Sequence, residues 1–216
     1  MNAIVQQSAL TTAQFPHSPL LRVAIVGSAG HGKSALINRL LSETDNVADN
    51  PVENGQAAGR RDIPVEWSLR TASRDFVLID AQAQAQLQRD AIAGAAQADA
   101  AVLVLDAAEW AHGQPRLYGL VLQLLGVRQV IVVINEMDRV AYDAGRFREI
   151  ETGIRKDLES FGLAATEVIP VSARDGVGIT EHTYTAEWYR PTLVEALDRL
   201  SPVMPQPRHP VNRCQA

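Results

Sequence analysis

The chain has 216 residues, of which 46% are hydrophobic and 21% charged, and its formal net charge is −5. This composition is ordinary for a globular protein and supplies enough apolar residues for one sizeable core. The acidic balance argues against a nucleic-acid binder, because nucleic-acid binders usually need a basic face. The single cysteine, Cys214, cannot build a disulfide framework, so a reducing cytoplasm is expected. No apolar run approaches the ~20 residues of a membrane span, so no membrane partner is expected.

Three regions differ in composition. Residues 1–19 are polar and lack a signal-peptide pattern, so we expect a disordered N-terminal arm there. Residues 20–200 alternate apolar runs with helical patterns, and one domain is expected over this range. Residues 201–216 hold four prolines and no apolar period, which is typical of an extended tail.

Apolar and β-branched segments predict six strands, and the strand that starts near Pro64 is expected at an edge of the sheet. The predicted strands are residues 21–26, 63–69, 75–80, 100–106, 129–135 and 167–171. Amphipathic or helix-favouring patterns lie between them. The predicted helices are residues 35–41, 82–97, 114–125, with Leu117 and Leu120 in its apolar period, 143–161, and 191–200, with Pro191 in its first turn. Alternating strands and helices favour an α/β three-layer sandwich with a mostly parallel sheet and one antiparallel edge strand.

Residues 27–34 read G-S-A-G-H-G-K-S, which fits the G-x-x-x-x-G-K-S pattern of a Walker A phosphate loop. A predicted strand precedes the loop and a predicted helix follows it, as the motif requires, so the fold is expected to be that of a P-loop NTPase. Glycines let successive N–H groups point at one phosphate, and the helix dipole adds to the anion site. Lys33 would reach the β- and γ-phosphates, and the Ser34 hydroxyl would bind Mg²⁺. The predicted phosphate-binding residues are Gly27, Gly30, His31, Gly32, Lys33 and Ser34.

A catalytic role for the His31 side chain is the weaker interpretation, because this position of the loop tolerates most residues.

Further polar residues and one glycine fall where the predicted strands end. They are Gly27, Asp80, Asp106, Asn135 and Ser172. Because the carboxyl ends of parallel strands meet at one edge of a sheet, we expect these residues to converge there.

Two motifs after the later strands indicate guanine recognition. Residues 135–138, N-E-M-D, resemble the N-K-x-D motif. The Asp138 carboxylate would accept hydrogen bonds from N1–H and the 2-amino group of guanine, a pair of donors that adenine lacks. Ser172 and Ala173 resemble the S-A motif, whose backbone N–H contacts the guanine oxygen. The predicted guanine-binding residues are Asn135, Asp138, Ser172 and Ala173, and the expected ligands are GTP or GDP with Mg²⁺.

In register, these motifs make the chain resemble the G domain of translation-factor-type GTPases. It is most similar to the GTPase subunit of bacterial sulfate adenylyltransferase, through residues 27–41, 126–138 and 169–195. The ending W-Y-R-P-T-L-V-E at residues 188–195 is the most family-specific stretch. The resemblance covers about residues 20–200 and does not reach the two β-barrel domains with which that family continues. It implies a cytoplasmic GTPase coupled to a partner subunit that forms adenylyl sulfate.

The chain departs from that family's pattern at three positions. Glu136 stands where the family has a lysine over the phosphate loop, and Pro64 stands where a threonine binds Mg²⁺ and the γ-phosphate. Asp80, implied to hold Mg²⁺ through water, is retained, but Ala83 replaces the glycine of the D-x-P-G-H run. Gln84 occupies the slot of a water-orienting residue and is the candidate catalytic group. The start of a solvated helix explains Gln84 equally well.

Three functional classes therefore remain open. The first is a guanine-nucleotide-binding protein with slow hydrolysis coupled to a protein partner. The second is a pseudo-GTPase that acts as a regulatory or scaffold module, which the departures at Pro64, Ala83 and Glu136 favour. The third is a P-loop kinase or ATPase, against which Asp138 argues, because an adenine pocket has no use for that carboxylate.

Overall fold

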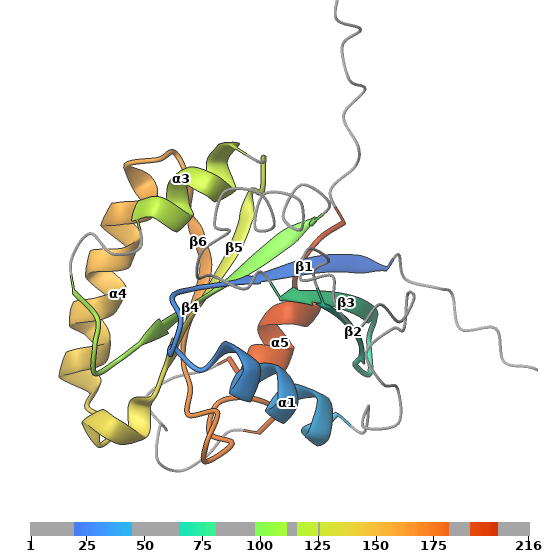
Figure 1. Cartoon of the computed structure of the whole chain (residues 1–216), viewed down its shortest axis with the longest axis horizontal. Helices are drawn as coiled ribbons and strands as arrows, with labels where there is room; N and C mark the ends of the chain where they lie inside the picture. Colours follow the sequence, from blue (N-terminus) through green and yellow to red (C-terminus); the bar gives the residue numbers. More distant parts are fainter. Residues whose placement is uncertain are drawn as a thin grey trace, which may run out of the picture.

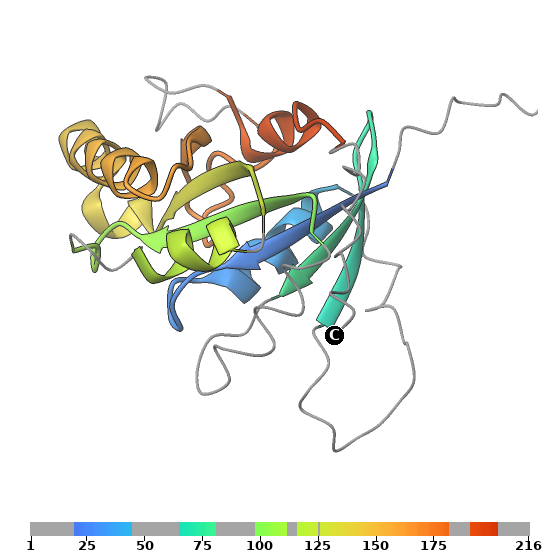
Figure 2. The same ribbon diagram turned by 90° about the horizontal axis from the view of Figure 1, so that it is seen from above.

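The computed structural model describes residues 20–44, 65–80, 98–111, 116–124, 126–181 and 191–202. Six strands form one sheet in the order β2-β3-β1-β4-β5-β6 (Figure 1). Their bounds are β1 Leu21–Val26, β2 Val65–Arg70, β3 Asp75–Asp80, β4 Ala100–Asp106, β5 Gln129–Asn135 and β6 Ala165–Pro170. Only β2 is antiparallel, and it lies at the edge beside β3, so the predicted mostly parallel α/β sheet is confirmed. Figure 2 shows β2, in teal, turned away from the central strands by the twist of the sheet.

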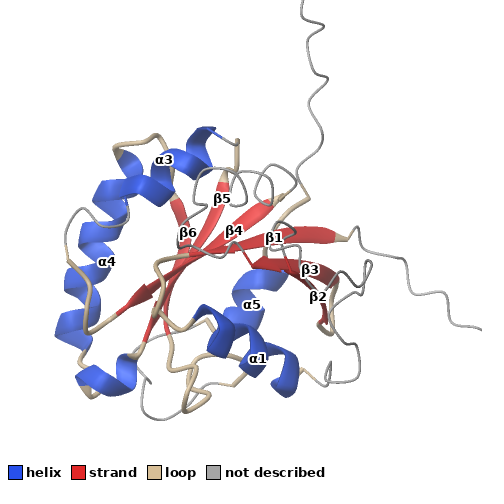
Figure 3. Ribbon diagram, in the orientation of Figure 1, coloured by secondary structure: helices blue, strands red, loops and turns tan. Residues whose placement is uncertain are grey.

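The described helices cover both faces of this sheet. Their bounds are α1 Lys33–Glu43, α3 Arg116–Leu124, α4 Ala144–Glu159, α5 Leu193–Asp198 and the 3₁₀ turn η1 Met137–Val140. Helices α1 and α5 lie on one side of the strands, and α3 and α4 lie on the other (Figure 3). The helix expected over residues 82–97 and the N-terminal arm lie outside the described residues, as does the tail from residue 203.

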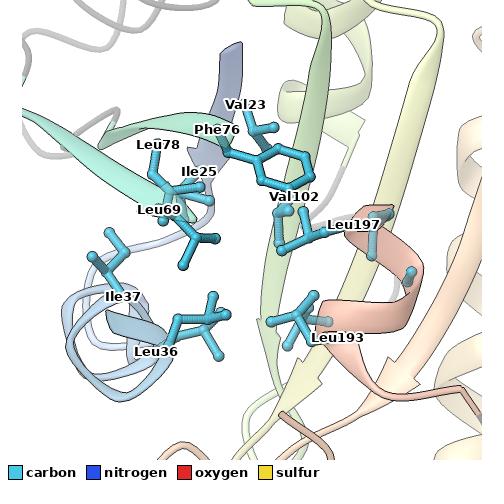
Figure 4. Close-up of a cluster of buried hydrophobic side chains, with 14 of the residues drawn as sticks. Val23, Ile25, Leu36, Ile37, Leu69, Phe76, Leu78, Val102, Leu193 and Leu197 are labelled. Carbon is cyan, nitrogen blue, oxygen red and sulfur yellow. The ribbon is translucent and has the colours of Figure 1, made fainter. Parts of the chain in front are cut away.

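The two cores follow from the alternation of side chains along the central strands. In β4, Val102 and Val104 face α1 and α5, whereas Leu103 and Leu105 face α3 and α4. Figure 4 shows the first of these cores, where side chains of α1 and α5 meet β1, β3 and β4. All seven residues of β4 are buried. Full burial of each of its valines and leucines stabilises the fold by roughly 1.5–3 kcal/mol relative to exposure, which anchors the strand ends that carry the site.

The structure corrects the apolar face expected for the helix at 114–125. Leu117 and Leu120 are 52% and 40% exposed, whereas Leu122 is fully buried. The reason is Gly119, because a Cβ there would lie 3.0 Å from a ring carbon of Phe161. The missing side chain lets α3 approach α4 closely, and this turns the Gly119–Leu122 side of the helix inward rather than the leucine-rich side.

The closing helix also begins later than expected. Thr192 is the N-cap of α5, and its side chain accepts a hydrogen bond from the Glu195 N–H while the Glu195 carboxylate accepts one from the Thr192 N–H. This capping box satisfies two backbone donors at the helix start. Pro191 therefore precedes the cap and does not lie in the first turn.

The register of the parallel strands aligns their carboxyl ends. Asp106 of β4 pairs with Asn135 of β5, and Ile25 of β1 pairs with Asp80 of β3. The loops that leave β1, β3, β4, β5 and β6 therefore begin at one edge, as predicted. Among the described residues, no helix combines the length and the apolar character needed to cross a bilayer.

Candidate functional site

The phosphate loop runs from the end of β1 to the start of α1, and its backbone requires glycine at two close approaches. Gly27 has a φ of 151°, and a Cβ there would lie 2.4 Å from the carbonyl oxygen of Val104. Gly32 has a φ of 80°, and a Cβ there would lie 2.3 Å from Nδ2 of Asn135. Both the left-handed conformation and the lack of space exclude larger residues. The glycines that defined the motif thus form the tight turn that it needs.

Lys33 is buried at the first turn of α1 and folds back over the loop. Its Nζ donates hydrogen bonds to the carbonyl oxygens of Gly27 and Ser28, both at 2.9 Å. Burial lowers the pKa of Lys33, and the nearby Asp80 carboxylate opposes that shift. Ser34 follows on the exposed side of the turn. A cation and a hydroxyl group therefore lie at the helix N-terminus, where an anion is favoured.

Asp80 ends β3 and is 3% exposed. Its Oδ1 is buried and accepts no hydrogen bond from the described residues. Burial raises the pKa of Asp80, and the charge of Lys33 opposes this. A buried carboxylate oxygen without a donor is costly, so a hydrated cation beside it would be stabilising.

The residues near Asp80 fit Mg²⁺ better than a metal held by the protein alone. Within the described part of the chain, no cluster of three or more His, Cys, Asp or Glu residues is suited to a metal ion. Mg²⁺ commonly uses one or two protein oxygens together with phosphates and waters. Asp80 and the exposed Ser34 hydroxyl match that donor set.

The His31 side chain is buried against the backbone of β4. It is 5% exposed, and its Nδ1 lies 3.2 Å from the carbonyl oxygen of Val104. The backbone carbonyl of His31 accepts a hydrogen bond from Asn135. The residue therefore fixes the loop against β4 and β5, and its own N–H donates to the carbonyl oxygen of Ser28 at 3.4 Å. Its phosphate contact stays a prediction.

Asn135 joins the phosphate loop to the loop after β6. It is fully buried, its Nδ2 donates to the His31 carbonyl at 3.0 Å, and its Oδ1 accepts from the Ala173 N–H at 3.0 Å. Both ends of the amide are therefore used within the protein. Its predicted contact with guanine, and that of Ala173, stay predictions, but the structure gives Asn135 a positioning role between the two loops.

Asp138 lies in η1 with its carboxylate held in place. Its Oδ1 accepts a hydrogen bond from the Ser172 hydroxyl at 2.8 Å, and its Oδ2 lies 3.9 Å from Nη1 of Arg174. Ser172 is fully buried, and its Oγ also accepts the Asp175 N–H at 3.2 Å. The side chain of Asp138 is 14% exposed. One oxygen of the Asp138 carboxylate is thus fixed, and the group stays partly exposed. A carboxylate that accepts hydrogen bonds from two adjacent donors needs both features.

Glu136 lies over the phosphate loop in a strained conformation. Its φ is 62° and its Oε1 lies 3.2 Å from the position that a Cβ of Gly32 would take. Burial, together with the Asp138 and Asp106 carboxylates, raises the pKa of Glu136. Arg139 opposes this shift, but it already pairs with Asp106 at 2.7 Å. A carboxyl group therefore stands beside the expected phosphates, where the family has a cation.

The structure brings most of the predicted site residues to one edge of the sheet. Those that it describes there are Gly27, Gly30, His31, Gly32, Lys33, Ser34, Asp80, Asn135, Asp138, Ser172 and Ala173. Gln84, Ala83 and Pro64 lie outside the described residues. The sequence reasoning missed Arg39, whose Nε donates to the Ala173 carbonyl at 3.1 Å. No motif marks Arg39, because it sits two turns into an ordinary amphipathic helix.

Comparisons with known proteins agree with this geometry. The sequence profile of the elongation factor Tu GTP binding domain matches residues 18–203. Elongation factor 1-alpha of Pyrococcus furiosus is 31% identical over 218 residues, which cover 90% of this chain and 50% of the relative. Elongation factor 1-alpha of Methanopyrus kandleri is 32% identical over 199 residues, which cover 84% and 47%. The chain thus spans about half the length of the curated relatives it matches.

Solved structures show the same fold. Sup35 complexed with GDP has a TM-score of 0.64 and 25% identity, covering 90% of this chain and 47% of that one. Sup35 complexed with GMPPNP has a TM-score of 0.63 and 25% identity, covering 84% and 45%. These matches confirm the predicted P-loop fold and the resemblance to translation-factor GTPases. The chain belongs to the elongation factor Tu GTP-binding domain family.

Proposed function

We propose that this chain binds GTP and GDP together with Mg²⁺. The observation that carries the proposal is the Asp138 carboxylate, which Ser172 orients at 2.8 Å on the same sheet edge that holds Lys33. An accessible carboxylate edge suits the N1–H and 2-amino donors of guanine. The phosphate loop and its helix suit the phosphates. The two Sup35 structures, which hold GDP and GMPPNP, support the same assignment.

The phosphate and metal roles divide among three side chains. Lys33 would contact the β- and γ-phosphates, while Ser34 and Asp80 would hold Mg²⁺, with Asp80 acting through water. Bound Mg²⁺ would supply charge neutralisation at the phosphates. The backbone N–H groups of the loop would complete the anion site.

Hydrolysis of GTP is the second part of the proposal, and we expect it to be slow. Gln84 would orient the attacking water. Glu136 places a negative charge over the phosphate loop, and the replacements at Ala83 and Pro64 would weaken sensing of the γ-phosphate. An enzyme with intact base recognition and a poor γ-phosphate response is the expected result.

Binding and turnover are separable by experiment. The dissociation constants of GTP, GDP and ATP with Mg²⁺, measured by titration calorimetry, should show guanine nucleotides bound and ATP not bound. Phosphate release from GTP should be slow in the wild type and slower still in Gln84→Ala. Equal affinity for ATP and GTP would refute guanine recognition.

A pseudo-GTPase is the second candidate function, and the position of Glu136 favours it. A carboxylate beside Gly32 repels the phosphates of any nucleotide. Such a chain would bind GDP weakly, release no phosphate from GTP, and act as a scaffold or regulatory module. Guanine-nucleotide binding without turnover, unchanged by Gln84→Ala, would support this candidate over a slow GTPase.

For the partner, we propose a sulfate adenylyltransferase-type catalytic subunit in the cytoplasm, on the sequence resemblance alone. The resemblance is strongest at residues 188–195. Within it, Thr192 and Glu195 form the capping box of α5. Stimulation of GTP hydrolysis by that purified subunit would support the pairing, and an unchanged rate at saturating subunit would refute it.

A further inference from the structure

Arg39 of α1 holds the loop that follows β6. Its Nε donates to the carbonyl oxygen of Ala173 at 3.1 Å, and its Nη2 donates to the carbonyl oxygen of Arg174. Hydrogen bonds from a charged donor are stronger than neutral ones. The guanidinium thus holds two successive peptide carbonyls, in the same loop in which the Ala173 N–H donates to Asn135 and the Ser172 hydroxyl orients Asp138.

Glu43, one turn further along α1, contacts both Arg39 and the same loop. Its Oε1 lies 3.7 Å from Nε of Arg39, and its Oε2 accepts the Thr180 hydroxyl at 2.6 Å. Gly176 has a φ of 80°, and a Cβ there would lie 2.7 Å from Oε1 of Glu43. The loop therefore turns tightly against the end of α1. A larger residue at position 176 would be strained by the positive φ and would displace the Glu43 carboxylate.

The same helix begins inside the phosphate loop. Lys33 is the first residue of α1, and Arg39 lies six residues later, about 9 Å along the axis at 1.5 Å per residue. Because both residues belong to one hydrogen-bonded α-helix, a shift of the phosphate loop would displace Arg39 as well. Asn135 makes a second, shorter link, from the His31 carbonyl to the Ala173 N–H.

We propose that Arg39, supported by Glu43, is a positioning residue that couples phosphate binding to base recognition. It fixes the peptide groups of residues 173 and 174, and through them Ser172, whose hydroxyl orients the Asp138 carboxylate. The coupling rests on the proposed guanine-nucleotide binding. It requires that loss of Arg39 weakens ligands that carry a guanine base and spares ligands that consist of phosphate alone.

The test compares GDP with inorganic diphosphate, both with Mg²⁺, by titration calorimetry on the full chain. In Arg39→Ala, the dissociation constant of GDP should rise about tenfold, equal to about 1.4 kcal/mol, while that of diphosphate should change less than about twofold. Arg39→Lys keeps a cation but loses the planar fork, so it should fall between the wild type and the alanine variant. Asn38→Ala, an exposed change on the same helix, is the matched control and should leave both constants unaltered.

Gly176→Ala disturbs the contact between this loop and the end of α1 without changing Arg39. It should show the same selective loss of GDP affinity, so the test does not depend on whether Arg39→Ala folds. Equal losses for GDP and diphosphate would reduce Arg39 to a merely structural role and overturn the coupling. An unchanged GDP affinity in Arg39→Ala and Arg39→Lys would overturn it as well. A wild type that binds diphosphate but not GDP would instead refute the proposed function, and the coupling would fall with it.

Discussion

The base side and the phosphate side of the candidate site differ in how their polar groups are bonded. On the base side, Asn135 bonds at both ends of its amide, to the His31 carbonyl and the Ala173 N–H, and Asp138 accepts from the Ser172 hydroxyl, at 2.8–3.0 Å. On the phosphate side, within the described part of the chain, Lys33 bonds only to carbonyls of its own loop, and Asp80 keeps a buried oxygen without a donor. Buried charge is thus compensated on one side and only partly compensated on the other.

Because of this difference, selectivity for the guanine base and affinity for the phosphates would depend on groups that are bonded in different ways. The groups that would select guanine are fixed before a nucleotide arrives, so little conformational entropy is lost there on binding. The groups that would hold phosphates and Mg²⁺ carry perturbed pKa values, raised for Asp80 and lowered for Lys33, both mainly by burial. A phosphate beside Lys33 and a cation beside Asp80 would relieve those costs, so ligand binding should stabilise the phosphate side most.

The largest expected effect comes from the phosphate side. Lys33→Ala removes the buried cation that faces the phosphates, and the dissociation constant of GDP should rise about 100-fold or more, equal to at least about 2.7 kcal/mol. Titration calorimetry with GDP and Mg²⁺ checks this. An unchanged affinity would mean that the phosphates do not lie at this loop.

On the base side, the second-largest effect is expected on the free energy of unfolding of Asn135→Ala. Asn135→Ala leaves the His31 carbonyl and the Ala173 N–H without the partners that they have now. Losing two buried hydrogen bonds should lower the free energy of unfolding by about 2–4 kcal/mol. Urea denaturation without nucleotide measures it, and Asn38→Ala is an exposed control. A change below about 0.5 kcal/mol would show that the two loops are not held together by this amide.

Glu136 lies between the base side and the phosphate side, and its replacement by lysine should strengthen GDP binding. Two like charges about 6 Å apart cost roughly 3 kcal/mol at an effective dielectric constant near 20, before salt screening. With screening, Glu136→Lys should lower the dissociation constant of GDP about tenfold. The gain should shrink at high salt. Weaker binding by the lysine variant would contradict the placement of this side chain near the phosphates.

The smallest expected effect is a pH dependence. Because the pKa of Glu136 is raised, mainly by burial and by Asp138, its carboxylate becomes neutral at a higher pH than an ordinary glutamate. As the pH falls through that pKa, the repulsion of phosphates disappears and GDP binding should tighten. The ratio of the wild-type dissociation constant to that of Glu136→Gln should therefore exceed one near pH 8 and fall toward one as the pH drops through the raised pKa of Glu136. A constant ratio would show that Glu136 does not titrate against the ligand.

Much of the fold follows from local patterns in the sequence. The apolar strands and the G-x-x-x-x-G-K-S loop are short-range signals, and the structure bears them out. The apolar face of α3 does not follow from its leucines, because Gly119 allows a close approach to Phe161 that only tertiary packing reveals. The boundary at Pro191 shifts for a similar reason, since the cap at Thr192 fixes where α5 begins.

The candidate site divides in the same way. The motif residues Lys33, Asp80 and Asp138 were predictable because strand ends meet at one edge of a parallel sheet. Arg39 was not, because its partners are backbone carbonyls at residues 173 and 174, far away in the sequence. Contacts of this kind depend on loop geometry and leave no residue pattern.

The measurement that tests the account most directly is nucleotide selectivity in Asp138→Asn. An amide at this position can still accept the Ser172 hydroxyl, so the fold of the base side should persist. The wild type should bind GDP and bind neither ADP nor xanthosine diphosphate, whereas the variant should lose GDP and gain xanthosine diphosphate, whose 2-keto group accepts from an amide. If the variant keeps its affinity for GDP, Asp138 does not read the base, and the account of the base side is wrong.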